Sequence, residues 1–244
     1  MQHKPLILAL LAGLSLSGAA QATLIDRGGG LIYDNALNVT WLQNANLAAT
    51  DTFGVSGISS GGLMSWNTAN QWIGAMNTAD YQGYSDWRLP TTAPINGSAF
   101  DYTYTYNGTT DVGYNISAPG TAHAGSKGSE MAYLFFNDLG NKAYYDTSGT
   151  PQAGFGANAG PFQNPQFGGY WSGTEYAPNT SGAWYFYAGF GGQFISLKTS
   201  SFYAAAVRPG DVAAAGSGTV PEPQTLALMG LGLMGMVFAR RRRG

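Results

Sequence analysis

Few side chains in this sequence could do chemistry, and their types exclude most catalytic arrangements. The chain contains no cysteine, which excludes disulfides, thiolate metal sites and cysteine nucleophiles. A Ser-His-Asp triad would have to use His123, because His3 lies in a segment that we expect to be removed. His123 stands in a loop of small residues, so a solvated loop histidine is the better interpretation. Zinc would lack nitrogen and sulfur ligands here.

Carboxylates are the remaining candidates for metal binding or acid–base catalysis. Ca²⁺ accepts scattered oxygen ligands, so a calcium site is open to Asp101, Asp111, Asp138 and Asp146, although none has the spacing of a recognised calcium loop. Two carboxylates about 5 to 10 Å apart can also hydrolyse a glycosidic bond. Nothing in the sequence marks Glu130 and Glu175 as such a pair, so we expect no catalytic residue and no required cofactor.

The charge balance argues against nucleic acid as a partner. Between Thr23 and Asp211 the chain has six Lys or Arg against twelve Asp or Glu, a net charge of −6. Phosphate contacts need clustered cations, which this region lacks. Charged residues make up only 10% of the chain and aromatic residues 14%, so rings must supply much of the core.

Aromatic side chains are the alternative means of binding a ligand. In Phe100–Tyr106 rings alternate with polar residues, which predicts a strand with one aromatic face. Asn107-Gly108 follows, a preferred two-residue turn, so Thr109–Tyr114 is expected to return as a hairpin. Pro151–Gly169 is expected to be a long loop. From these segments we predict five ligand-facing rings: Tyr102, Tyr104, Tyr106, Phe162 and Phe167.

Two helices and several hairpins must position these rings. Ser65 is a plausible N-cap for a helix with Trp66, Ala69, Trp72, Ile73 and Met76 on one stripe, and a second helix is expected over Ser129–Leu139. We interpret the tryptophans as core. The other expected elements are a Leu31–Asp34/Val39–Leu42 hairpin, a Thr50–Gly62 loop, an Ala183–Phe190/Gln193–Leu197 hairpin and a closing strand over Tyr203–Arg208. The fold class is therefore α+β.

The N-terminus has the pattern of an export leader. Lys4 precedes an apolar core over Leu6–Leu16, and Ala20 and Ala22 fit the small-x-small cleavage rule. Cleavage after Ala22 would leave Thr23 as the first mature residue. A retained membrane helix is the alternative, but the apolar run is shorter than the roughly 20 residues that spanning requires.

The C-terminus has three parts in order: Val220-Pro221-Glu222-Pro223, an apolar run over Leu226–Ala239, and Arg240, Arg241, Arg242 and Arg243. As a helix the run would measure about 21 Å. It would therefore span a core of about 30 Å only with help from flanking residues. The arginines place the tail on the cytoplasmic side. This arrangement resembles the bacterial PEP-CTERM sorting signal, which implies export, transient capture at the inner membrane and cleavage by an exosortase-type protease. A permanent tail anchor is the alternative.

Six blocks in the central region, in order, resemble the DUF1566 domain, also called the Lcl C-terminal domain. The most specific is Ser85-Asp86-Trp87-Arg88-Leu89-Pro90-Thr91. The others lie at 30–42, 65–69, 170–175, 183–184 and 206–209. The expected organisation is therefore a leader at 1–22, this domain at 23–211, a flexible linker at 212–219 and the sorting signal at 220–244.

The resemblance implies a fold related to C-type-lectin-like and formylglycine-generating-enzyme-like domains, with a twisted antiparallel sheet, two helices and long loops. It implies no catalytic reaction, and the cysteines of the formylglycine chemistry are missing. Asp86 and Arg88 could pair with each other or bond neighbouring turns, and Arg208 could tie the chain end to a carboxylate such as Asp86 or Glu175. We interpret such pairs as structural, and Trp87, Trp171 and Trp184 as core.

The sequence therefore predicts an exported, non-enzymatic protein of the cell surface or extracellular matrix, associated with exopolysaccharide or another glycan. Two alternatives stay open. One is a secreted polysaccharide hydrolase, which would need a cleft with two carboxylates. The other is a purely structural envelope protein without a ligand.

Overall fold

The computed structural model describes residues 24–156 and 158–212. Its strands are β1 (Leu24–Gly28), β2 (Leu31–Asp34), β3 (Val39–Leu42), β4 (Tyr104–Thr105), β5 (Val112–Tyr114), β6 (Gly169–Glu175), β7 (Gly182–Tyr187), β8 (Gly192–Leu197) and β9 (Val207–Pro209). Its helices are α1 (Trp66–Thr78) and α2 (Glu130–Tyr133), which continues as a π-helical turn over Leu134–Asp138, and short 3₁₀ turns lie at Leu47–Ala49 and Tyr81–Gly83. The leader, the linker from residue 213 and the sorting signal lie outside the described residues.

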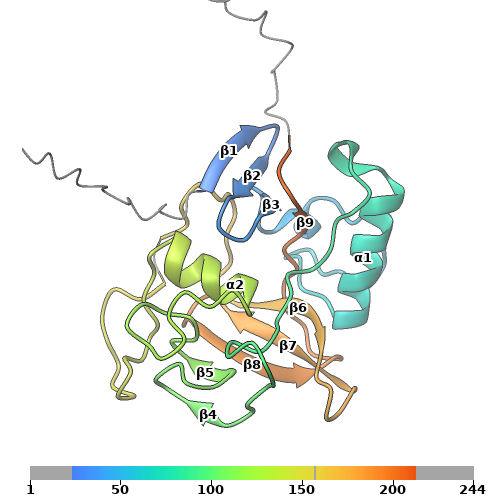
Figure 1. Cartoon of the computed structure of the whole chain (residues 1–244). Coiled ribbons are helices and arrows are strands. Elements are labelled where there is room, and N and C mark those ends of the chain that lie inside the picture. Colours follow the sequence, from blue (N-terminus) through green and yellow to red (C-terminus); the bar gives the residue numbers. More distant parts are fainter. Residues whose placement is uncertain (1–23, 157, 213–244) are drawn as a thin grey trace, which may run out of the picture.

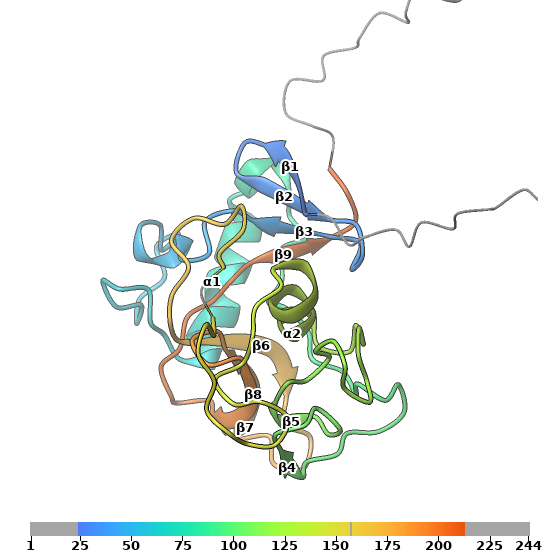
Figure 2. The same cartoon turned by 90° about the vertical axis from the view of Figure 1, so that its left-hand side faces the viewer.

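The strands form two sheets, where one antiparallel sheet was expected. The first has the order β1-β2-β3-β9 and the second β4-β5-β8-β7-β6. In both views α2 lies between the sheets (Figures 1 and 2), and in Figure 1 α1 runs along the right-hand side of the molecule. The α+β class is confirmed. Within the described residues, no helix is both long and apolar enough to cross a membrane.

The first hairpin forms where the sequence predicts it. The Asp34 carboxylate accepts the backbone N–H groups of Ala36 and Leu37 at 3.0 and 2.9 Å, which closes the turn, and Asn38 adopts a positive φ of 54°. β3 then pairs with β9, so the last strand closes this sheet. The closing strand is shorter than predicted, and β1 was not expected.

α1 begins at its predicted N-cap, and α2 begins where the sequence predicts a helix, with Ser129 as its N-cap. The Ser65 hydroxyl accepts the N–H of Thr68, and the Ser129 hydroxyl accepts that of Ala132. On α1, Ala69, Trp72, Ile73 and Met76 are buried, as the stripe predicts. α2 widens after one turn, where the N–H of Leu139 bonds the carbonyl of Leu134.

The hairpin predicted over Phe100–Tyr114 is wrong. β4 and β5 pair in parallel, because β5 takes β8 as its antiparallel partner and the chain loops round between them. Buried Asp111 holds this loop: its carboxylate accepts the N–H groups of Ile95 and Asp101, both at 2.8 Å. Gly113 allows β4 to approach, since a Cβ there would lie 1.8 Å from the Thr105 carbonyl oxygen.

The later hairpin is confirmed, with β7 and β8 paired from Gly182↔Leu197 to Tyr187↔Gly192. Its connection is the four residues 188–191, longer than the predicted Gly191-Gly192 turn. The segment predicted as a long loop, Pro151–Gly169, is described apart from residue 157, and its described part contains no helix or strand until β6 begins at Gly169. Trp87, Trp171 and Trp184 are 2% exposed or less, as the core interpretation predicts.

Candidate ligand-binding surface

One face of the second sheet carries a continuous group of aromatic rings. Side chains alternate along β7: Trp184 and Phe186 are buried on one face, while Tyr185 and Tyr187 are half-buried on the other. β8, β5 and β4 add further rings to this second face. The resulting group, here termed the aromatic band, comprises Tyr104, Tyr106, Tyr114, Tyr144, Tyr145, Tyr187, Phe190 and Phe194.

Every ring of the band contacts another in a stacked, edge-to-face or tilted arrangement. Tyr106 stacks on Tyr114 with centroids 5.8 Å apart and planes within 5°, and Tyr104 meets Tyr106 edge-to-face at 5.2 Å. At the other end Tyr187 stacks on Phe190 at 5.1 Å and 10°. Such pairs stabilise each other by about 0.5–1.5 kcal/mol beyond area burial, so the band is held in place before any ligand arrives.

Gly192 makes room for the band. A Cβ at this position would lie 2.6 Å from the Phe194 ring and 3.1 Å from the Tyr114 ring. The absence of a side chain lets both rings lie across the strand, where a larger residue would lift them off the sheet.

The band is partly open to solvent. Tyr104 is 48% exposed and Phe190 39%, and the other six rings are half-buried. Burial raises the pKa of the Tyr104 and Tyr114 hydroxyls, which therefore stay protonated and can both donate and accept hydrogen bonds. Apolar ring faces combined with neutral hydroxyls suit a ligand that is itself partly apolar and uncharged.

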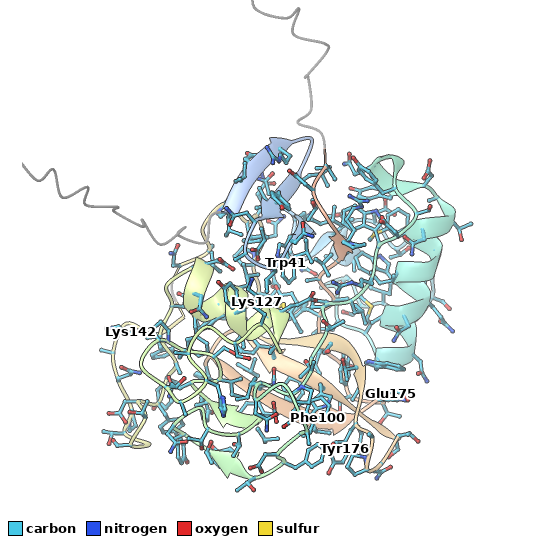
Figure 3. The ribbon with its side chains drawn as sticks, in the orientation of Figure 1. Trp41, Phe100, Lys127, Lys142, Glu175 and Tyr176 are labelled. Carbon is cyan, nitrogen blue, oxygen red and sulfur yellow. The ribbon has the colours of Figure 1, made fainter. Side chains whose placement is uncertain are left out.

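The five predicted ligand-facing rings are not brought together. Tyr104 and Tyr106 belong to the band. Tyr102 is half-buried elsewhere, 6.0 Å from the Trp184 ring and 5.0 Å from that of Tyr176. Tyr102 also stacks on Phe100 at 5.8 Å, and Phe100 in turn stacks on Trp184 at 4.9 Å; Figure 3 labels Phe100 and Tyr176, the two ring neighbours of Tyr102 on the surface of this group. Phe162 and Phe167 both line a separate pocket.

Sequence reasoning missed most of the band. Tyr144 and Tyr145 lie in a segment with no regular pattern. Tertiary folding alone brings Tyr145 beside Tyr106 and Tyr114, and Tyr144 beside Phe190. The alternation in Gly182–Tyr187 and Gly192–Leu197 was a usable signal, because it places Tyr185, Tyr187 and Phe194 on a shared face once the hairpin is recognised.

Most of the charged residues that the sequence analysis singled out form ion pairs. Arg88 binds Glu130 through two hydrogen bonds of 2.7 Å, so the Asp86–Arg88 pair, one of the two predicted arrangements, does not form. Arg88 also donates to the carbonyl of Leu89 at 3.1 Å. Arg208 binds Asp86 through two hydrogen bonds of 2.7 and 2.9 Å, and Asp86 was one of its two predicted partners. Lys198 pairs with Glu175.

The four carboxylates considered for calcium do not converge. In the part of the chain that the structure describes, no group of three or more His, Cys, Asp or Glu could hold a metal ion. Asp101 and Asp146 accept local N–H groups instead, from Thr103 and from Ser148 and Thr150. His123 is half-buried in the turns that precede α2.

A different carboxylate pair is brought together by folding. Asp34 of the first hairpin is fully buried. Folding brings its carboxylate near that of Asp138, at the end of the α2 extension, so that the two interact electrostatically. Neither Asp138 oxygen has a hydrogen-bond partner among the described residues. Burial, followed by the charge of Asp34, raises the pKa of Asp138 to about 8. A substrate could not reach Asp34, which argues against a catalytic dyad.

Asp138→Asn is expected to stabilise the protein at pH 8. A folded pKa of about 8 exceeds the unfolded value, so the native state binds more protons between pH 4 and 8 and wild-type stability falls as pH rises through this window. Because Asp138 is only half-buried as a residue, screening limits the effect to on the order of 1 kcal/mol. Urea unfolding at pH 5 and pH 8 measures it.

Asp146→Asn serves as the control. Its hydrogen bond from Ser148 lowers the pKa of Asp146, so that carboxylate stays ionised in both states over this window and the variant should retain the wild-type slope. An Asp138→Asn protein with the same decline as wild type between pH 5 and 8 would contradict the assignment.

Comparison with known families places these observations in context. Residues 30–208 match the Lcl C-terminal domain, and residues 219–243 match the PEP-CTERM protein-sorting motif. The first match covers most of the chain, which therefore belongs to the Lcl C-terminal domain family. The second indicates a membrane-anchored precursor that is sorted to the cell surface and processed by exosortase-type machinery. No curated protein and no solved structure matches the chain.

Several predictions concern residues outside those that the structure describes, and they stay predictions. They are the leader cleavage with Ala20 and Ala22, the membrane helix at 226–239, and the roles of Val220–Pro223 and Arg240–Arg243. The domain boundaries also stay predictions.

Proposed function

We propose that this protein is displayed outside the cell and binds extracellular polysaccharide through the aromatic band, without catalysing a reaction. The band is the observation that carries the proposal: eight rings in mutual contact, two of them widely exposed, on a face with neutral hydroxyls. Flat rings pack against the apolar CH faces of sugar rings, and hydroxyls then orient the ligand. This arrangement needs no charge on the glycan, which suits an acidic domain.

The position of the band supports display. Both ends of the described chain lie at the β1–β9 end of the molecule, and β4, which carries Tyr104, lies at the opposite end (Figures 1 and 2). The ion pair between Arg27 and Asp211, with 2.9 Å between Arg27 Nε and Asp211 Oδ1, holds the point where the chain leaves the last strand. A tail attached there would leave Tyr104 on the side away from the attachment.

The state of the glutamates supports a non-enzymatic role. Both carboxylate oxygens of Glu130 bond Arg88, and one also accepts the N–H of Thr91 at 2.7 Å. Glu175 is paired with Lys198. Both carboxylates are thus engaged by cations of the fold, whereas an acid or base catalyst must be free to reach the proton of a substrate. We further infer a relation to C-type-lectin-like folds, from the family and from the combination of short strands, two helices and long loops.

Removal of the exposed rings tests the function. A Tyr104→Ala/Phe190→Ala double variant of the exported protein is expected to lose at least tenfold in affinity for any polysaccharide that wild type binds on a glycan array, since contact rings of this kind each contribute more than about 1 kcal/mol. Leu197→Ala is the matched control, because Leu197 is 59% exposed on the same sheet but is not aromatic.

Two outcomes would defeat the proposal. One is the absence of binding to every glycan tested, together with an intact matrix in cells that lack the protein. The other is full affinity in the double variant. The first outcome would favour a structural envelope protein without a ligand.

A further inference from the structure

A second feature, separate from the aromatic band, is an apolar pocket of about 140 Å³ between the two sheets. Its walls come from both sheets and from the α2 extension: Trp41 of β3, Phe135 of the extension, and Tyr170 and Phe186 of the second sheet. Figure 3 shows Trp41 beside α2. The 158–167 part of the long loop covers it, and two backbone hydrogen bonds of 2.9 and 2.8 Å tie Gln163 to Ala45 and Gln43. The pocket is therefore built from well-held segments.

Its size and lining restrict what it could hold. No charged side chain lines it, so a charged ligand would lose its hydration without compensation. An apolar cavity of roughly 150 Å³ holds a single benzene ring. Aromatic walls at different angles favour a planar ring, because rings prefer edge-to-face contacts. Trp41 and Phe162 already meet in this way, at 6.5 Å and 88°.

One polar group in the wall has an unused donor. Tyr170 is 3% exposed, and its hydroxyl oxygen accepts the backbone N–H of Gln166, another lining residue, at 2.8 Å. Its own proton has no acceptor in the part of the chain that the structure describes. Burial raises the pKa of this hydroxyl, so the donor persists at all physiological pH values. A buried donor without an acceptor costs free energy that a ligand oxygen would recover.

We propose that this pocket binds a neutral, single-ring aromatic compound with one hydrogen-bond-accepting oxygen, whose ring lies among Trp41, Phe135, Phe162 and Phe186 and whose oxygen accepts the Tyr170 hydroxyl proton. This pocket is a second site, and its proposed ligand does not depend on polysaccharide binding, since no residue of the aromatic band lines the pocket.

Phenol and benzene are the probes for this site. Calorimetric titration of the mature protein recovered from producing cells is expected to give a dissociation constant for phenol of about 1 mM or below. Tyr170→Phe keeps the ring and removes the donor, so it should lower the affinity for phenol relative to benzene by about fivefold, which corresponds to one neutral hydrogen bond. This ratio would not change if Tyr170 were merely structural.

Filling the pocket provides the second test. Ala159→Phe places a ring in the pocket from its loop wall and should abolish phenol binding, while Ala153→Phe, on an exposed position of the same loop outside the pocket, should bind as wild type. Phenol affinity retained in Ala159→Phe would overturn the proposal, as would a phenol-to-benzene ratio unchanged in Tyr170→Phe. Tighter binding of 1-hexanol than of phenol would overturn the assignment to a ring. Neither Ala159→Phe nor Ala153→Phe changes a residue of the aromatic band, so the test of glycan binding can fail or succeed independently of this one.

Discussion

Arg88→Met is expected to lower the free energy of unfolding by about 3 to 5 kcal/mol, because it leaves the Glu130 carboxylate buried without its cation. Glu130 is 7% exposed and its two oxygens both bond the Arg88 guanidinium at 2.7 Å. Arg88 also exchanges backbone hydrogen bonds of 2.8 and 2.9 Å with Val207. The pair therefore joins the most specific block of the family, α2 and the closing strand. Urea unfolding at pH 7 measures the loss.

Arg208→Met is the matched control for this variant. Arg208 makes the same bidentate contact with Asp86, but the Asp86 side chain is 44% exposed, and water can solvate the carboxylate once the guanidinium is gone. Its loss should be about 1 kcal/mol. Adding Glu130→Leu to Arg88→Met should restore much of the stability, since an apolar pair removes the unpaired charge. Equal losses in the two arginine variants would contradict this account of Glu130.

Trp171→Ala is expected to lower the free energy of unfolding by a similar 3 to 5 kcal/mol, through the cavity that it leaves. Trp171 is fully buried, its indole N–H donates to the Met64 carbonyl at 3.0 Å, and its ring meets that of Phe202 at 4.8 Å. Removal of the indole opens the largest core cluster between α1 and β6. It also removes one of the two donors to the Met64 carbonyl oxygen, which keeps the backbone N–H of Phe202 at 3.0 Å. Chemical denaturation monitored by circular dichroism measures the effect.

Phe167→Ala is the control, because Phe167 is 65% exposed and its removal leaves no closed cavity; its effect should stay within about 0.5 kcal/mol. A Trp171→Ala protein that loses less than about 1 kcal/mol would show that the surrounding core collapses into the space.

Local patterns predicted the elements whose contacts are close in the sequence. The first hairpin depends on a turn that Asp34 closes within three residues, and α1 depends on Ser65 and a stripe of apolar residues at helical spacing. Neither needs a distant partner to be recognised. α2 was likewise predicted from Ser129 onward, but its π-helical turn could not be, since widening of a helix leaves no signature in the residue pattern.

Long-range contacts decided the region where prediction failed. Asn107-Gly108 forms a turn, since the Asn107 carboxamide accepts the N–H of Thr109 at 3.2 Å, yet the flanking segments do not pair as a hairpin. The Asp111 carboxylate, 16 residues beyond Ile95, bonds that residue's N–H, and β8 competes for the edge of β5. Ile95 and β8 are both remote in sequence from the Asn107-Gly108 dipeptide, so the dipeptide alone could not show how the flanking strands pair.

By itself the sequence determined that this chain has no thiol chemistry and that its central domain is acidic and rich in aromatic rings. It also determined the two helices and the sorting motif at the end of the chain. Each of these follows from residue types or from spacings within a few positions. Only the tertiary structure decided which carboxylate each arginine binds, which rings share a face and that a pocket lies between the sheets. Those features depend on residues up to 184 positions apart, as in the Arg27–Asp211 pair, and such pairs meet only when the strands settle into their register.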